Sequence, residues 1–206
     1  MLINAKRRVL IDLLDNKGQY LLLTFFLVVG ITAGTFTVSN MHEGSKEALD
    51  SYVGALFLSV QTASVDYLKV FLHALLQDTL VFGVIAMFGL MVMGIPCIAL
   101  TIIVKGFCVG FTVGVLALNL GAGGLIAIAF CAFVSNLVLI PCVLKAGVLG
   151  IHNAVDVFKS RHIPKTSADK LMMSKPFLGR IMVVYAISLI GVLIETFLTP
   201  LLIKTL

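Results

Sequence analysis

The chain has 206 residues, of which 60% are hydrophobic and 12% are charged, and its net charge is +5. A water-soluble domain carries roughly 25% charged residues, so this composition excludes an ordinary soluble fold and indicates that lipid surrounds most of the chain. The basic residues lie in short segments between apolar runs, a pattern typical of membrane orientation and not of nucleic-acid binding.

The N-terminal segment, residues 1–18, is basic and mildly amphipathic, and we expect it to lie at the cytoplasmic membrane surface. The first apolar run, residues 19–38, is close to the ~20 residues that a helix needs to cross the hydrocarbon. It is too long for the core of a signal peptide, and no A-x-A-like cleavage site follows it. We therefore predict an uncleaved first membrane helix.

The next segment, residues 39–78, contains more acids than bases and is predicted to lie outside the cell. Its second half is amphipathic, because polar residues share one helical face and leucines cover the other. We expect this half to form an outer helix along the membrane interface. Its polar face, with Asp66, Lys69 and His73, is a candidate docking surface for a partner.

A second span is predicted over residues 79–104, with a kink at Pro96, where the helix lacks a backbone hydrogen bond. Lys105 is predicted to mark a tight turn. Two apolar runs follow, residues 106–123 and 124–144, with a glycine cluster at their junction. The first is short for a ~30 Å core, so it either crosses the bilayer with help from its flanks or re-enters on one side.

Residues 145–180 hold the strongest basic cluster and are predicted to form a cytoplasmic loop before a last span at 181–203. The positive-inside rule places 1–18 and 145–180 on the cytoplasmic side and 39–78 outside only if 106–123 crosses the membrane. We therefore predict a single all-α domain, a polytopic membrane bundle of five transmembrane helices with an outer amphipathic helix. Its N-terminus is cytoplasmic and its C-terminus extracytoplasmic.

Three glycines, Gly106, Gly110 and Gly114, recur at every fourth residue and therefore lie on one helical face. Such a strip of bare backbone lets two helices approach closely in lipid. Two interpretations stay open: the strip packs against another span of the same chain, or it forms the contact face of a homo-oligomer or a groove for a partner.

Glu195 is interpreted as the only charged residue deep within a predicted span, in the outer half of its helix. Charged residues in hydrocarbon mark pathways or polar contacts. Candidate partners are Lys69 and His73 of the outer segment and Asn119 near the outer end of the third span. A pathway needs several such groups in series, so a structural tie near the interface is the favoured interpretation.

Ser135 and Asn136 are the polar residues of the fourth span, and interhelical hydrogen bonding is their expected role. The four histidines are scattered, and all four cysteines lie in apolar runs, as expected for buried thiols. No catalytic motif or metal-ligand spacing is present, so we expect no enzymatic activity, metal or cofactor.

Two strings of the chain, IIVKGFCVGFTVGVLALNLGAGGL and the closing IETFLTPLLIKTL, resemble the stage II sporulation protein M family of endospore-forming bacteria. The stretch from Ser135-Asn136 to Pro141 and the order of spans resemble that family as well. The resemblance implies a scaffold in the mother-cell membrane during engulfment of the forespore. It also implies two partners that remodel septal peptidoglycan, stage II sporulation proteins D and P.

Two other functions are weighed against this scaffold. A transport permease, or the membrane subunit of a transporter, is suggested by Glu195, the interrupted second span and the short glycine-rich third span, because broken helices often line substrate sites. An intramembrane enzyme has the least support, since the predicted spans contain no paired Asp, HExxH or Ser–His arrangement.

Overall fold

The computed structural model describes residues 15–62, 67–91, 93–119, 121–159 and 167–205, and these residues form six helices and no strand. The helices are α2 (Lys17–Ser39), α3 (Glu43–Thr62), α4 (Tyr67–Gly89), α5 (Gly94–Asn119), α6 (Gly121–Lys159) and α7 (Ser167–Thr205). The predicted segment 1–18 lies outside the described residues except at its last four positions.

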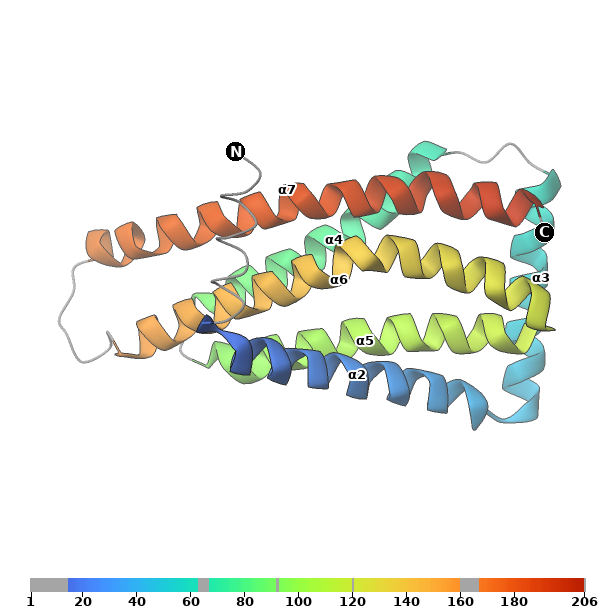
Figure 1. Ribbon diagram of the computed structural model, residues 1–206, viewed down its shortest axis with the longest axis horizontal. Coiled ribbons are helices and arrows are strands. Elements are labelled where there is room, and N and C mark those ends of the chain that lie inside the picture. The colour runs from blue at the N-terminus through green and yellow to red at the C-terminus, as the bar shows by residue number, and fades with distance from the viewer. Residues whose placement is uncertain (1–14, 63–66, 92, 120, 160–166, 206) are drawn as a thin grey trace.

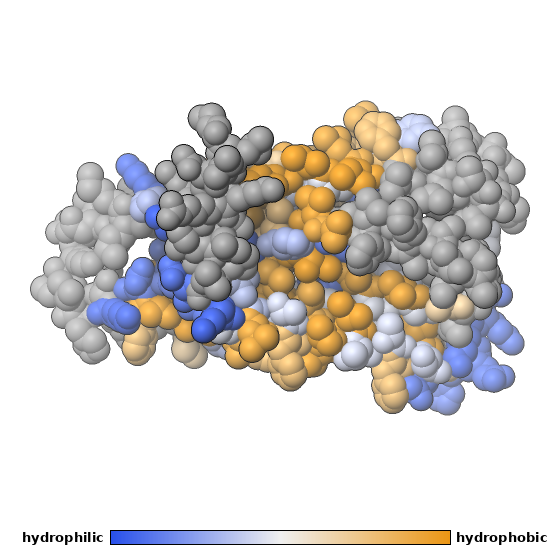
Figure 2. Space-filling view, viewed as in Figure 1, coloured by the Kyte–Doolittle hydropathy of each residue, from blue (hydrophilic) through white to orange (hydrophobic). Residues whose placement is uncertain are grey.

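Five stretches of these helices are long and apolar enough to cross a membrane: Lys17–Ser39, Tyr67–Gly89, Gly94–Val115, Asn136–Lys159 and Lys175–Phe197. Their helices pack side by side along the long axis of the molecule, while α3 lies across one end (Figure 1). Figure 2 shows apolar residues along the middle of the molecule and hydrophilic residues at both ends. The predicted polytopic helical bundle is therefore confirmed.

The two ends of the bundle differ in charge. At one end α2 begins, α4 connects to α5, α6 ends and α7 begins (Figure 1). We call it the basic end, after the exposed residues Lys17, Lys159, Lys175 and Arg180. At the other end, which we call the α3 end, exposed acidic residues lie on α3, namely Glu43, Glu47 and Asp50.

The predicted turn at Lys105 is wrong, because α5 runs without a break from Gly94 to Asn119. The chain reverses instead at residues 90–93, between α4 and α5. Pro96 is the third residue of α5, where the backbone N–H has no partner within the helix, so proline is tolerated there without a kink. A third span that begins at Gly94 is long enough to cross, and the predicted boundaries 79–104 and 106–123 are corrected accordingly.

The predicted interfacial helix in the second half of 39–78 is also wrong. Residues 67–78 are the first half of the spanning helix α4, and the outer helix is α3. No proline stands between Tyr67 and Gly89, and the leucines of the first half continue the apolar surface of the second. Asp78 therefore lies halfway along α4 and not at its end.

The predicted loop 145–180 is largely helical, since α6 continues to Lys159 and α7 begins at Ser167. The connection between them falls at residues 160–166, outside the described residues. The candidate spans in these helices, Asn136–Lys159 and Lys175–Phe197, replace the predicted 124–144 and 181–203.

The core lies where α2, α4, α5 and α6 meet. Its fully buried side chains include Leu23, Ile85, Ile98, Ile102 and Ala146, whereas large apolar side chains also cover the outer surface of every span. Because lipid is as apolar as these side chains, their burial supplies little drive for helices to associate. Close backbone approach and interhelical hydrogen bonds must hold the bundle together, and both occur.

Candidate functional site

The closest helix pair is α2 with α5, and glycines line both of its faces. A Cβ atom at Gly106 would overlap the backbone oxygen of Leu27, and one at Gly110 would overlap the backbone oxygen of Ile31. In return, a Cβ at Gly30 would overlap the backbone oxygen of Ile103. Each helix thus needs glycine where the other helix's backbone passes, which is the small-residue mode of association in membranes.

Two further glycines extend this interface toward the α3 end. A Cβ at Gly34 would overlap the backbone oxygen of Phe107, and one at Gly114 would lie 3.1 Å from the Cβ of Val38. The structure therefore places all three predicted glycines against α2 of the same chain. Sequence analysis missed the α2 partner, although GITAG at residues 30–34 has the same four-residue spacing.

A second interhelical contact is polar and joins α4 to α7. Asp78, 2% exposed, lies opposite the fully buried Ser188, with 2.6 Å between the Asp78 Oδ2 and Ser188 Oγ atoms. The Ser188 hydroxyl is also 2.8 Å from the backbone oxygen of Tyr185. Within the described part of the chain, Asp78 Oδ1 has no hydrogen-bond partner.

The Ser188 hydroxyl links α7 to α4. Its single proton can be donated to the Asp78 carboxyl or to the Tyr185 backbone oxygen, both of which lie within hydrogen-bond distance. A buried carboxyl without such a contact is costly, so this hydrogen bond ties the two helices together.

Thr79 extends the contact. Its hydroxyl donates to the backbone oxygen of Leu75 at 2.6 Å, so the 2.7 Å bond between Thr79 Oγ1 and the Tyr185 hydroxyl is donated by Tyr185. The Tyr185 ring meets Phe82 edge-on, with 5.4 Å between centroids. We call Asp78, Thr79, Tyr185 and Ser188 the polar seam.

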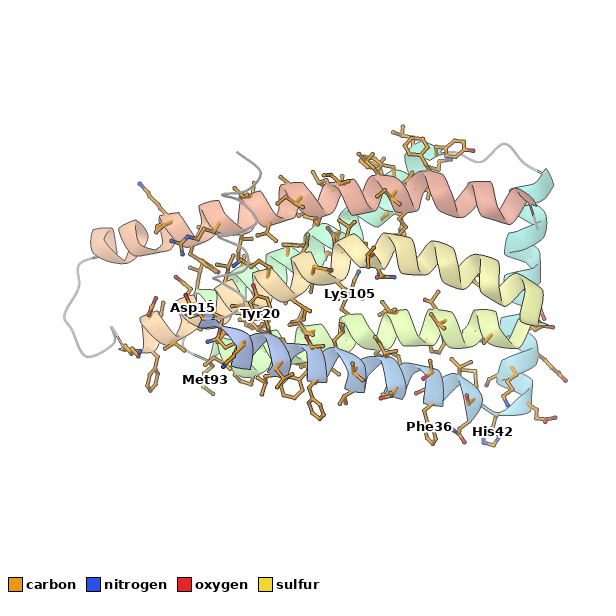
Figure 3. All side chains as sticks on the ribbon, in the orientation of Figure 1. Asp15, Tyr20, Phe36, His42, Met93 and Lys105 are labelled. Carbon is orange, nitrogen blue, oxygen red and sulfur yellow. The ribbon has the colours of Figure 1, made fainter. Side chains whose placement is uncertain are left out.

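The prediction that Glu195 is the only charged residue deep within a span is wrong. The structure places Asp78, Lys105 and Lys145 within candidate spans as well. Figure 3 shows Lys105 midway between the ends of the bundle, extending from α5 toward α6. Lys105 and Asp78 are charged groups near the half-buried Glu195. The sequence does not reveal this proximity, because a turn is predicted at Lys105.

The other predicted site residues are distributed over several elements. Lys69 and His73 are exposed on the first turns of α4, near the α3 end, and Asn136 is half-buried on α6. Asp66 lies outside the described residues, as do the side chains of Asn119 and Ser135. Among the described residues, no three His, Cys, Asp or Glu side chains gather as metal ligands.

The cysteines were predicted to be buried, and this holds for Cys142 but not for Cys108. Cys108 is exposed on the outer face of α5, and Cys97 is half-buried. The prediction was wrong because an apolar run in a membrane helix has a lipid-facing side as well as a core-facing one. The side chain of Cys131 is outside the described residues.

A cavity of about 310 Å³ opens at the basic end, between α6 and α7. Two hydrogen bonds tie its wall to neighbouring helix ends: His152 Nε2 lies 2.6 Å from Asn16 Oδ1, and Asn153 Nδ2 donates to the backbone oxygen of Gly89 at 2.9 Å. Sequence analysis missed it, because residues far apart in the chain line it. The lining residues are Asn16, Val148, Leu149, His152, Asn153, Asp156, Pro176, Phe177 and Arg180.

With this geometry in place, the comparison with known families is decisive. The family model of stage II sporulation protein M matches residues 23–200. The chain belongs to this family. The match runs from α2 into α7, and so includes both the glycine interface and the polar seam. The resemblance seen in the two sequence strings is confirmed, and membership indicates a multi-pass membrane protein of sporulation. No curated protein and no solved structure matches the chain.

Proposed function

We propose that this chain is a non-enzymatic membrane scaffold of the engulfment machinery. It anchors and positions peptidoglycan-degrading partners at the mother-cell membrane, and the partners are stage II sporulation proteins D and P. The observation that carries the proposal is α3, a 20-residue helix laid across one end of a closely packed bundle (Figure 1). A helix held there offers a fixed surface at the edge of the membrane.

The proposed orientation has the basic end in the cytoplasm and the α3 end facing the septal wall. Cytoplasmic segments next to membrane spans carry an excess of Lys and Arg. The described part of the basic end carries the exposed cations Lys17, Lys159, Lys175 and Arg180 against the exposed acids Asp15 and Asp156, whereas α3 carries more acids than bases. This asymmetry supports the orientation, with the N-terminus inside and the C-terminus outside.

The proposed docking surface is the exposed face of α3, with the exposed first turns of α4 as a second contact near the same end of the bundle. On α3 the exposed side chains include Glu47, Asp50 and Tyr52, and on α4 they include Lys69 and His73. Charged groups on such a surface set orientation and partner choice, while an exposed aromatic ring supplies contact area. This surface replaces the separate outer helix expected from the sequence.

Charge reversal on α3 tests the proposal. The double variant Glu47→Lys/Asp50→Lys should still accumulate in the membrane, because both side chains are exposed. Co-purification from sporulating cells should then recover the peptidoglycan enzymes at roughly a tenth of the wild-type level or less, as expected when like charges meet across an interface.

The matched control is Lys159→Glu, which reverses an exposed charge at the opposite end of the bundle. It should leave recovery of the enzymes unchanged. Equal recovery of the enzymes with the α3 variant and with the wild-type chain would contradict docking on α3. Loss of the enzymes with Lys159→Glu alone would place the docking surface at the basic end.

A second candidate, ion or proton transport, is favoured by one observation. Asp78, Lys105 and Glu195 lie within spans on three different helices, and intramembrane charges often mark ion pathways. Asp78→Asn and Glu195→Gln, each of which removes an acid while keeping its shape, test this function. A transporter should lose activity in both variants, whereas a scaffold should complete engulfment in both.

A further inference from the structure

The cavity at the basic end lies at the depth where the bundle leaves the hydrocarbon. Asn16 directly precedes α2, and Gly89 is the last residue of α4. Both are hydrogen-bonded to the cavity wall, through His152 and Asn153 on α6. Because the ends of two candidate spans are tied to this level of α6, we place the cavity mouth level with the lipid headgroups. Figure 1 shows the start of α2, the last turns of α6 and the first turns of α7 at this end.

The cavity has an apolar floor and a charged rim. Val148 and Phe177, which are 1% and 5% exposed, form part of the lining, together with Leu149 and Pro176. The charged lining residues, Asp156 and Arg180, are both exposed. A volume of about 310 Å³ is at the lower end of the range for small-molecule sites, ~300–1,000 Å³. It suits a headgroup and the start of its acyl chains.

Arg180 contributes a positive charge to the lining of this cavity. Although Asp156 lines the same space, the described residues include no ion pair to either Arg180 or Asp156. A guanidinium presents five N–H donors in a fork that matches the oxygens of a phosphate. The wall adds polar groups held in fixed positions, since Asn153 is bonded to Gly89 and His152 to Asn16.

We propose that this cavity binds the phosphate headgroup of an anionic phospholipid, with Arg180 as its main ligand. The surrounding cations favour an anion, because Lys17, Lys159 and Lys175 are exposed at the same end. Lipid phosphates are the anions present at this depth, and basic pockets between membrane helices are suited to them. Asp156 opposes the bound phosphate and limits its affinity. The site depends on the membrane spans and not on the scaffold role.

Lipid retention by the purified full-length chain tests the site. The chain is purified in detergent with phosphatidylglycerol and phosphatidylcholine supplied in equal amounts, and bound lipid is counted by native mass spectrometry. The wild type should retain phosphatidylglycerol in preference. Arg180→Gln should lower its retention by about tenfold, as expected for the loss of one charge-assisted contact.

Two further variants make the test specific. Lys175→Gln removes an exposed cation from the same helix outside the cavity lining, and retention should stay within about twofold of the wild type. Asp156→Asn should raise retention, because it removes the one carboxylate of the lining.

Several outcomes would overturn the proposal. Unchanged retention in Arg180→Gln, equal losses in Arg180→Gln and Lys175→Gln, or lowered retention in Asp156→Asn would each exclude this site. Competition by inorganic phosphate at the same concentration as the lipid would show that the ligand is a free anion. The α3 variant Glu47→Lys/Asp50→Lys should retain phosphatidylglycerol like the wild type, so failure of the scaffold proposal and failure of the lipid proposal are distinguishable.

Discussion

At the scale of single residues, Asp78 departs furthest from what the sequence suggests. A charged residue next to an apolar run normally marks the end of a span, and by that rule the second span begins at Thr79. In the structure the helix starts at Tyr67, and Asp78 is 2% exposed at its middle. The rule fails because the Asp78 carboxyl is enclosed within the bundle, where it is hydrogen-bonded to Ser188 and shielded from lipid.

The hydrogen bond between Ser188 and Asp78 can be tested by substitution. Interhelical hydrogen bonds in membranes contribute ~0.6 kcal/mol on average. Ser188→Ala should lower the free energy of unfolding by more, about 1–3 kcal/mol, because it leaves a buried acid unpaired. Asp78→Asn should cost less, because its amide oxygen can still accept a hydrogen bond from the Ser188 hydroxyl. Unfolding in detergent micelles measures both.

The control for these substitutions is Ser51→Ala on α3, where the exposed hydroxyl bonds only within its own helix. It should change the free energy of unfolding by less than about 0.5 kcal/mol. If Asp78→Asn were as damaging as Ser188→Ala, a hydrogen-bond acceptor at this position would not be sufficient, and the carboxyl itself would be needed.

At the scale of helices, the number of spans and their order could be predicted from hydropathy and charge, but several boundaries could not. From the sequence, the lone charge of Lys105 predicts a turn, but Lys105 lies in the middle of α5. Pro96 predicts a kink, but it lies in the first turn of α5, where proline does not interrupt a helical hydrogen bond. The glycine strip was found, but its partner on α2 was not, because spacing identifies a face and not what covers it.

The glycine interface yields a prediction with a matched control. Gly110→Leu should cost at least about 1–3 kcal/mol and reduce accumulation, because its Cβ overlaps the backbone of Ile31. Gly83→Leu is the control: Gly83 also lies in a spanning helix, but a Cβ there meets nothing within 4 Å. The amount of folded protein in the membrane and its unfolding midpoint measure both. Equal accumulation of Gly110→Leu and wild type would show that α2 and α5 can separate without penalty.

At the scale of the whole molecule, the two ends of the bundle differ in charge. The polar seam and the glycine interface hold the helices so that exposed Lys and Arg residues gather at one end, and the proposed orientation rests on this asymmetry. The candidate site could be predicted only in part, since the cavity is formed by residues from the start of α2, the end of α6 and the start of α7. Only the folded structure brings these residues together.

Cysteine labelling of intact cells tests this orientation. With the native cysteines replaced, a probe that cannot cross the membrane should react with Glu47→Cys on α3, which is exposed at the α3 end. It should react with Lys159→Cys only after the membrane is permeabilised. The reverse pattern would invert the molecule and move α3 away from the septal wall.

The pairing of α2 with α5 also has a consequence for biogenesis. As the ribosome synthesises the chain, α2 emerges first, and its glycine face has no complement until α3 and α4 have been made and α5 has followed. During that interval Gly30 and Gly34 face lipid or the insertion machinery. The α2–α5 pair therefore cannot form until more than half of the chain has been made, and an insertase that shields α2 would assist this protein more than one that releases each hairpin as it forms.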